Sequence, residues 1–316
     1  MNTCQSVLDL TPFRQIDRAV SGEGFVDPGV TNFIQQLQAA MNEPVPLSFH
    51  IAQQLHQLKG KTVSLFTEFV VPDLLPHGEN DGPLGTLALA RSLDRCGLIP
   101  TIWVDAQLLD TIRWLEAELG LDLPIHAIDL NVLAATTVQP DVAIAIEKPG
   151  ENSQGVLHTF DGLAIEGGSI PIDRLFANFL TTEAVTIGIG DRGNEIGFGR
   201  LSETVAHLLP STTHCQCGCG GGVISSTSTG LFLPAAVSNW GAYGLSAALA
   251  ILESNKTLLH LPSEEERLLQ VAAVRGCVDG VRRRGVFGVD GLSGETSVSV
   301  VRQLQRIVQK AVQKEE

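Results

Sequence analysis

Two short apolar runs constrain the fold of this chain more than any other feature of its sequence. Residues 141–146 read DVAIAI and residues 184–189 read AVTIGI. A strand with one face in water alternates apolar and polar side chains, whereas these runs are apolar or small at nearly every position. Such runs are typical of strands that are covered on both faces. We therefore expect a buried, mostly parallel sheet.

Helical segments separate the expected strands. We predict strands at residues 61–70, 101–104, 124–128, 141–146, 184–189 and 231–237. We predict helices at residues 83–96, 107–119, 172–180, 194–208, 241–252, 263–275 and 295–312. Alternating strands and helices imply right-handed crossovers with helices on both faces of the sheet. The expected fold class is α/β, a mostly parallel sheet sandwiched by helices in a Rossmann-like, three-layer arrangement.

The first part of the chain is predicted to be a helical lead-in. Pro28 follows an aspartate and begins a probable helix through Met41, and a second helix is expected at residues 48–58. No linker or internal repeat divides the rest of the chain. We expect residues 1–60 to form a helical extension packed on the core, and residues 61–316 to form one α/β domain.

Composition argues against several classes of partner. The formal net charge of −14 disfavours nucleic acid, since binding to phosphates relies on clustered Lys and Arg. The longest apolar region, residues 231–252, is interrupted by proline and glycine, which argues against a membrane span. No secretory signal is visible at the N-terminus. We expect a soluble, cytoplasmic enzyme acting on a small anionic metabolite, and leave a homo-oligomer open.

Three of the six cysteines, Cys215, Cys217 and Cys219, alternate along a short run. No second Cys-x-x-Cys accompanies them, and cysteines at alternate positions do not easily reach one tetrahedral ion. We favour reduced, partly buried thiols over a structural zinc site. No disulfide framework is indicated, because a chain of this length can build an adequate core without one.

Acidic residues follow the expected strands. In an open parallel sheet, ligands bind beyond the carboxyl ends of the strands, so the loops after successive strands should meet there. Carboxylate oxygens are the ligands that Mg²⁺ and Mn²⁺ prefer. The sequence therefore predicts one site for a divalent metal. Its candidate carboxylates are Glu79, Asp81, Glu147, Asp191 and Glu195.

Simpler interpretations of the same residues remain open. Asp81 with Gly82 also fits a turn or a helix N-cap, and Glu195 fits a first-turn carboxylate that favours its own helix dipole. Gly190 and Gly193 suggest a phosphate-binding loop, but neither nucleotide-binding pattern is complete. A serine hydrolase would need a Gly-x-Ser-x-Gly elbow, which is absent.

The order of these loops resembles the C-terminal domain of D-glutamate cyclases. The resemblance runs from about Lys61 to the C-terminus, and its most specific parts are residues 190–197 (GDRGNEIG) and 238–241 (SNWG). The chain departs from the family pattern at Asn80, where the family usually has Thr, and at Arg192, where it has Gly. An expected Asp before the strand at residue 231 is also missing.

The resemblance implies an α/β enzyme that uses Mg²⁺ or Mn²⁺ to close D-glutamate to 5-oxo-D-proline with loss of water. The candidate metal ligands are then Asp81, Glu147, Asp191 and Glu195. Glu79 and Glu195 are the candidate catalytic residues, with Glu79 as base. The candidate substrate-binding residues are Lys148, Asn194, Asn239, Trp240 and Glu295.

Two other functions fit the same acidic loops. A Mg²⁺- or Mn²⁺-dependent phosphohydrolase would use the carboxylates for its metal and the amides of residues 190–193 around a phosphate. A non-catalytic metabolite-binding protein would retain the pocket alone. Metal-binding loops do not encode which bond is broken, so the sequence leaves both alternatives open.

Overall fold

The structure, a computed structural model, describes residues 9–131 and 139–313 and contains the predicted parallel sheet. The strands lie in the order β3-β2-β1-β4-β5-β6, and every neighbouring pair is parallel. Their bounds are β1 (Thr62–Thr67), β2 (Ile99–Val104), β3 (Ile125–Ala127), β4 (Val142–Ile146), β5 (Val185–Gly190) and β6 (Leu231–Pro234). All five residues of β4 are buried, as its continuous apolar sequence predicted.

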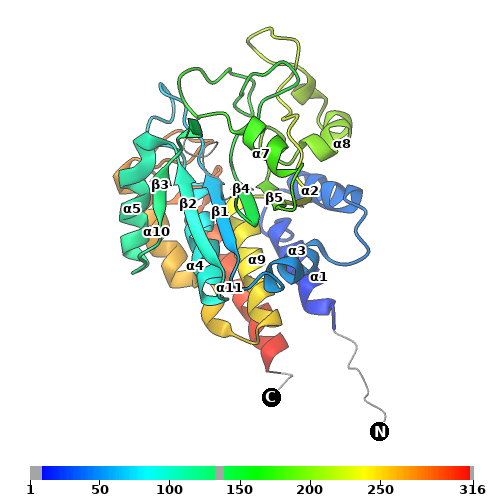
Figure 1. The fold of residues 1–316 in the computed structure, drawn as a ribbon, viewed down its shortest axis with the longest axis vertical. Coiled ribbons are helices and arrows are strands. Elements are labelled where there is room, and N and C mark those ends of the chain that lie inside the picture. The colour runs from blue at the N-terminus through cyan, green and yellow to red at the C-terminus, as the bar shows by residue number, and fades with distance from the viewer. Residues whose placement is uncertain (1–8, 132–138, 314–316) are drawn as a thin grey trace.

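Helices cover both faces of the sheet, which confirms the three-layer α/β prediction (Figure 1). The side chains of β4 divide between two cores: Ile144 joins the larger one and Ala143 the smaller. The larger core includes residues of α4 (Pro83–Arg95), α5 (Leu109–Glu118), α9 (Ser238–Leu252), α10 (Pro262–Arg275) and α11 (Gly294–Val312). The smaller core contains Phe176 and Phe179 of α7 (Asp173–Phe179).

Three helices precede the sheet, where a helical lead-in was expected. They are α1 (Thr11–Val20), α2 (Pro28–Ala40) and α3 (Leu47–His56). Asp27 caps α2 through a bond from the Gly29 amide at 2.7 Å. Residues of all three helices belong to the larger core, so these helices are packed on the α/β layers.

One predicted helix and one predicted strand are shorter than expected. Residues 194–198 form an irregular loop, and only residues 199–208 are helical, as a 3₁₀ turn (Gly199–Leu201) and α8 (Ser202–Leu208). Gly197 leaves helical geometry at φ 116°, where it packs against the Phe232 ring. Strand β1 ends at Thr67, because Glu68 turns the chain at φ 107°. Both changes place polar residues in loops at the same edge of the sheet.

The remaining short elements connect these layers. Three 3₁₀ turns occur at η1 (Ala106–Leu108), η3 (Pro210–Thr213) and η4 (Lys256–Leu258). A small antiparallel hairpin, β7 (Gly288–Val289) and β8 (Leu292–Ser293), precedes α11. Within the described ranges, no helix has both the length and the apolar character needed to cross a membrane.

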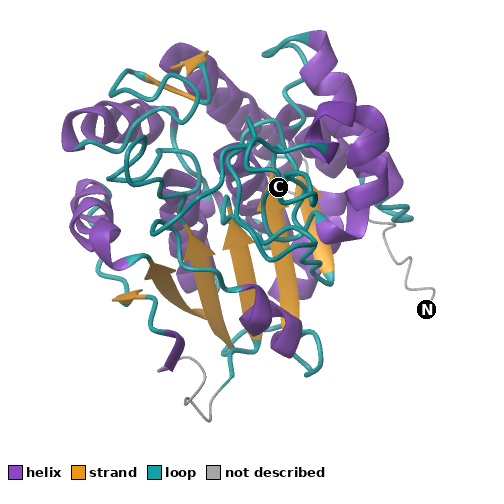
Figure 2. Cartoon of the chain, turned by 90° about the horizontal axis from the view of Figure 1, so that it is seen from above, coloured by secondary structure: helices purple, strands orange, loops and turns teal. Residues whose placement is uncertain are grey.

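The strand order reverses direction between β1 and β4. From β1 the chain builds outward through β2 and β3, and from β4 it builds the other way through β5 and β6. Loops that leave the carboxyl ends of β1 and β4 therefore diverge and open a crevice, which is where ligands bind in folds of this type. Figure 2 shows the connecting loops gathered beyond the arrowheads of the strands.

Candidate active site

Five carboxylates converge beyond the carboxyl ends of the strands, and we call them the acidic cluster. Potential ligand oxygens of Asp81, Asp191 and Asp290 lie within 4.8 Å of one another, and so do those of Glu147, Asp191 and Glu195. Asp191 belongs to both groups and joins them. The four residues predicted as metal ligands are thus brought together at the switch point. Their role as ligands stays a prediction.

Asp81 is fixed by the first turn of α9. Its Oδ2 accepts a hydrogen bond from the Ser238 amide at 2.9 Å, and its Oδ1 accepts one from the Asn239 amide at 2.7 Å. The positive end of a helix dipole favours a carboxylate at this place. Asp81 therefore caps a helix, as one interpretation of the sequence allowed, but that helix is α9 and not the adjacent α4. Capping leaves Asp81 close to Asp191 and Asp290.

Hydrogen bonds hold the carboxylates of Glu147 and Glu195 in place. Glu147 has a left-handed backbone at φ 48°, and its Oε2 accepts a bond from the Ser238 hydroxyl at 2.5 Å. Glu195 accepts bonds from the Arg192 and Gly193 amides at 3.2 and 2.9 Å. Left-handed geometry in a residue other than glycine costs free energy and tends to occur at functional sites.

Arg192 lies among the carboxylates. Its guanidinium is 3.2 Å from Asp191 and 3.1 Å from Asp290, and it stacks over the Phe160 ring at 4.5 Å. Burial disfavours the charged guanidinium, but Asp290 and Asp191 outweigh it and raise the pKa of Arg192. Arg192 and Asp290 were not among the predicted site residues. The Asp-Gly pair at residues 290–291, in the loop before the last predicted helix, was the sequence signal that could have identified Asp290.

Four carboxyl groups at this site hold protons more strongly than usual. Burial raises the pKa of Glu147 well above its ordinary value, and Glu195 and Asp81 raise it further. Burial and then Glu147 and Asp290 do the same for the pKa of Asp191. The pKa values of Glu79 and Asp81 are also raised, by burial first and then by Asp290. Like charges this close need either protons or a cation between them.

The residues present fit a divalent cation. The buried Oδ1 atom of Asp191 has no hydrogen-bond partner among the described residues, although it lies in both groups of the cluster. Several carboxylate oxygens within reach of one point form the hard donor set that Mg²⁺ and Mn²⁺ favour. The set contains no softer ligand such as a thiol or imidazole.

A cavity opens beside the acidic cluster. It encloses only about 20 Å³, room for roughly one water molecule. Glu79, Glu147 and Asp290 contribute acidic groups to its wall, and Arg192 and Arg283 contribute basic ones. Positive side chains beside carboxylates allow an anionic substrate to enter an acidic site.

The predicted substrate-binding residues are not all at this cavity. Asn194 lines it, whereas Lys148 forms an ion pair with Asp105 at 2.8 Å in which both side chains are fully buried. Trp240 is fully buried, and its indole N–H donates to the Ser297 hydroxyl at 2.8 Å. Asn239 bonds the backbone at residues 80, 82 and 85. Glu295 is exposed in the first turn of α11.

Glu68 carries another buried carboxyl group, and it was not among the predicted site residues. It adopts φ 107°, its side chain is fully buried, and neither of its oxygens has a hydrogen-bond partner among the described residues. Burial and then Asp105 raise its pKa well above the ordinary value, while Lys148 opposes them. No motif marked this position, because the predicted strand ran through it.

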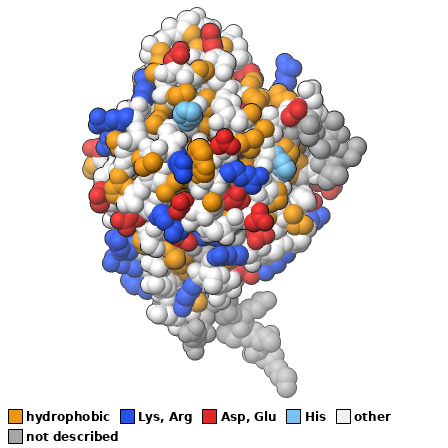
Figure 3. Space-filling model, turned by 90° about the vertical axis from the view of Figure 1, so that its left-hand side faces the viewer, with side chains coloured by type: hydrophobic (Ala, Val, Ile, Leu, Met, Phe, Trp, Pro, Cys, Tyr) orange, Lys and Arg blue, Asp and Glu red, His pale blue; other side chains and the backbone are white. Residues whose placement is uncertain are grey.

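Two arginines of the basic run at residues 282–284 form ion pairs with aspartates. Arg282 pairs with Asp279 at 2.8 Å and Arg283 with Asp161 at 2.6 Å. On the face in Figure 3, basic and acidic side chains are interspersed.

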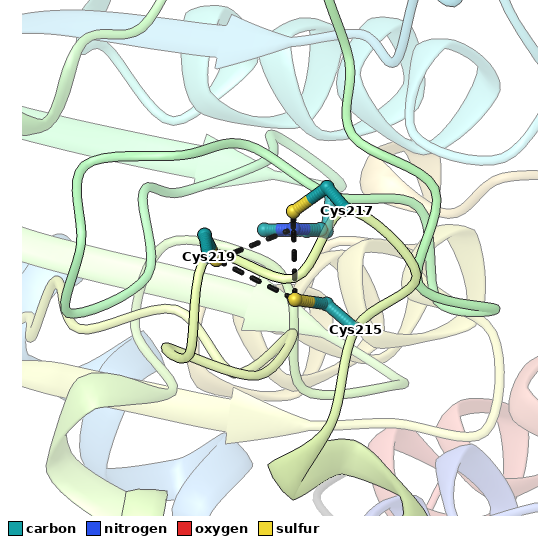
Figure 4. Close-up of side chains that lie close together, drawn as sticks. Cys215, Cys217 and Cys219 are labelled. Carbon is teal, nitrogen blue, oxygen red and sulfur yellow. Dashed lines mark hydrogen bonds between the residues drawn. The ribbon is translucent and has the colours of Figure 1, made fainter.

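The cysteine run forms a separate cluster. Sulfur atoms of Cys215, Cys217 and Cys219 and a ring nitrogen of His158 lie within 4.8 Å of one another (Figure 4). The expectation that alternate cysteines do not easily reach one ion is wrong, because the loop that carries them turns back on itself. Its intervening glycine, Gly218, adopts φ 73° and folds the chain back. We call these four residues the thiol cluster.

Comparisons with known proteins agree with the arrangement of these loops. The family model described as D-glutamate cyclase-like, C-terminal, matches residues 32–305. The chain is also 27% identical over 197 residues to the "D-glutamate cyclase, mitochondrial" of Homo sapiens. That match covers 57% of this chain and 31% of the human protein, so the chain spans less than a third of that relative's length.

Proposed function

The chain belongs to the D-glutamate cyclase-like family, and from this premise we propose that it is a metal-dependent lyase. The proposed reaction closes D-glutamate to 5-oxo-D-proline, or a related small amino or hydroxy acid to its own cyclic product, with loss of water. The observation that carries the proposal is the acidic cluster, which contains carboxyl groups of raised pKa and lies beside a cavity whose wall also contains arginine.

The reaction needs groups that accept and return protons. The substrate ammonium must lose a proton before its nitrogen can attack the γ-carboxylate carbon. The new C–N bond then replaces one C–O bond, and the departing oxygen takes up the two protons that nitrogen has lost. The charge balances, because one ammonium and one carboxylate become a neutral amide and water. Proton transfer by positioned carboxyl groups suits both halves of this exchange.

Residues of the cavity wall match these tasks. The pKa of Glu79 is raised by burial, Asp290 and Asp81, so its carboxyl group holds a proton more strongly than an exposed glutamate does. Glu195 is anchored by two backbone amides and remains close to Glu147 and Asp191. Arg192 and Arg283 supply positive charge for the substrate carboxylates. Holding amine and carboxylate together removes much of the entropic barrier to ring closure.

A bound Mg²⁺ or Mn²⁺ would supply Lewis-acid polarisation of the reacting carboxylate. Asp81, Glu147, Asp191 and Glu195 would hold it, since their oxygens form the two adjoining groups described above. This assignment also gives the buried, unpartnered Oδ1 of Asp191 a partner.

Product analysis tests the proposal. We expect 5-oxo-D-proline from D-glutamate without ATP, and only with added Mg²⁺ or Mn²⁺. Glu195→Gln should lower turnover by about a hundredfold or more, as losses of catalytic carboxylates generally do. The matched control is Glu203→Gln, which alters an exposed residue in the first turn of α8 and should retain activity. Phosphate release from sugar phosphates without any 5-oxoproline would instead favour a phosphohydrolase.

A further inference from the structure

The thiol cluster joins two loops that are distant in sequence. Cys215, Cys217 and Cys219 lie in the loop after η3, and His158 comes from the loop between β4 and α7. The sulfur of Cys215 is 3.5 Å from that of Cys217 and 3.4 Å from that of Cys219. The Nε2 atom of His158 is 3.2 Å from the Cys217 sulfur and 4.0 Å from the Cys219 sulfur. Figure 4 shows the three sulfur atoms turned toward one point.

These separations are those of ligands around a single ion. Zinc binds thiolate sulfur at about 2.3 Å, so two sulfurs on one tetrahedral zinc lie roughly 3.8 Å apart. The two sulfur–sulfur separations of 3.5 and 3.4 Å are slightly shorter than that value. The nitrogen–sulfur separations of 3.2 and 4.0 Å lie on either side of the roughly 3.5 Å expected when a ring nitrogen at about 2.0 Å shares the zinc with a thiolate. Three cysteines and one histidine also complete the four-coordinate set found in structural zinc sites.

The hydrogen bonds of His158 leave its Nε2 free for the cluster. The ring is fully buried, and its Nδ1 lies 3.1 Å from the Val156 carbonyl oxygen. A carbonyl oxygen only accepts, so Nδ1 carries the proton and the Nε2 lone pair faces the sulfurs. Histidines that bind metal typically donate their other ring N–H to a carbonyl or carboxylate in this way.

Donors around Cys219 favour a thiolate at that position. The Asn152 side-chain amide and the Gly221 backbone amide lie 3.3 and 3.4 Å from its sulfur. Both groups donate, and donation to sulfur is stronger when the sulfur is charged. Bonds of this kind orient the first ligands of a metal and tune its binding.

We propose that Cys215, Cys217, Cys219 and His158 bind one zinc ion in a closed structural site, separate from the acidic cluster. Each thiol releases its proton to solvent when the ion binds, and no oxidation or reduction takes place. Sulfur and imidazole donors select zinc over the Mg²⁺ or Mn²⁺ expected at the carboxylates. The two metal sites therefore differ in chemistry as well as in place.

The site would fix a wall of the cavity. The carbonyl of His158 accepts a bond from the Asn194 side chain at 3.0 Å, and the next two residues, Thr159 and Phe160, line the cavity. The Gln216 amide donates to Gly162 across the two loops at 2.8 Å. A zinc ion at the thiol cluster would hold these two loops in fixed positions relative to each other.

Metal analysis and cobalt substitution test the proposal on the full chain. The protein, purified with reductant and dialysed against a weak chelator, should retain about one zinc per chain by mass spectrometry, as expected for a closed site. Replacing zinc by Co²⁺ should produce thiolate-to-cobalt charge-transfer absorption. Cys217→Ser and His158→Ala should lose the zinc. Asp191→Asn, which alters the acidic cluster, should keep both the zinc and the cobalt absorption.

Cys96→Ser is the matched control for loss of a thiol. Cys96 lies at the end of α4 and is not part of the thiol cluster, so this variant should keep its zinc. The cobalt titration uses the unaltered protein, so its outcome does not depend on whether a variant folds. Absence of zinc together with no thiolate–cobalt absorption would overturn the proposal. Stoichiometric iron, or a disulfide between two of the three cysteines in the reduced preparation, would overturn it as well.

Discussion

Asp81 and Asn239 are 158 residues apart in sequence, and each caps the helix that begins beside the other. The Asp81 carboxylate accepts the Ser238 and Asn239 amides at the start of α9. The Asn239 side-chain oxygen accepts the Gly82 and Gly85 amides at the start of α4, at 3.0 and 2.6 Å. Two helix N-termini are thereby fixed beneath the acidic cluster, and their dipoles favour negative charge there.

Asn239→Ala should destabilise the fold strongly. The substitution removes two accepted bonds and the bond that Asn239 donates to the Asn80 carbonyl, all in a fully buried place. Leaving such groups unpaired should lower the free energy of unfolding by about 2–4 kcal/mol. Urea denaturation measures this loss. Asn255→Ala, at the cap of the more exposed 3₁₀ turn η4, should cost less, and equal losses for the two variants would contradict the reciprocal caps.

Divalent metal should stabilise the native protein. A ligand bound only by the folded state raises stability by about 2.7 kcal/mol at a hundredfold excess over its Kd. Melting curves with and without millimolar Mn²⁺ measure the effect. Asp191→Asn should abolish most of the rise in Tm, since Asp191 joins both groups of the acidic cluster. An unchanged Tm for the wild-type protein in Mn²⁺ would count against a metal there.

Without metal, the acidic cluster should make the protein less stable as pH rises. The folded-state pKa values of Glu79, Asp81, Glu147 and Asp191 are raised, mainly by burial. Above about pH 4, the unfolded carboxyls lose their protons while the folded ones keep them. The native state then binds more protons, so their contribution is full at low pH and is lost as pH rises through the folded pKa values.

Melting curves in EDTA at a series of pH values from about 5 to about 9, all above the ordinary carboxyl pKa of about 4, test this sign. Glu147→Gln removes one of the raised groups while keeping an acceptor for the Ser238 hydroxyl, so its loss of stability with pH should be shallower. With Mn²⁺ present the trend should weaken or reverse, because metal binding releases protons and strengthens with pH. A wild-type protein whose metal-free stability does not fall with pH, or falls no more steeply than that of the variant, would contradict the prediction.

The sheet and the meeting of the acidic loops were predictable from sequence for one physical reason. Strands buried on both faces leave apolar runs such as residues 141–146, and parallel strands end at one edge. The resemblance in the loops at residues 190–197 added the family, which the match over residues 32–305 confirms. Neither source of information depends on knowing side-chain conformations.

The details that sequence did not give depend on backbone angles and long-range contacts. Glu68 has a positive φ, which no local sequence pattern announces at this position. The thiol cluster needs His158, a residue 57 positions before the first cysteine of the run in a different loop. Arg192 was visible only as a departure from the family, and its partners Asp191 and Asp290 appear only when the loops are assembled.

Arg192 should limit how tightly the acidic cluster binds a divalent cation. Its guanidinium contacts Asp191 and Asp290 and places a positive charge beside the proposed metal. Arg192→Gln removes that charge, so Mn²⁺ affinity measured by calorimetry should rise by roughly tenfold, because like charges nearby cost on the order of 1 kcal/mol or more at a partly exposed site. The metal-free protein should melt at a lower temperature, because the carboxylates lose their cation.

Arg283→Gln is the matched control for this change. Arg283 also lines the cavity, but its ion-pair partner is Asp161, outside the acidic cluster. Its removal should leave Mn²⁺ affinity within about twofold of wild type, since its charge is paired with Asp161 and not with a carboxylate of the cluster. For D-glutamate, both variants should raise KM, because each removes positive charge from the wall that would meet the substrate carboxylates. An Arg192→Gln protein that binds Mn²⁺ more weakly than wild type would show that the guanidinium organises the carboxylates for the metal and does not compete with it.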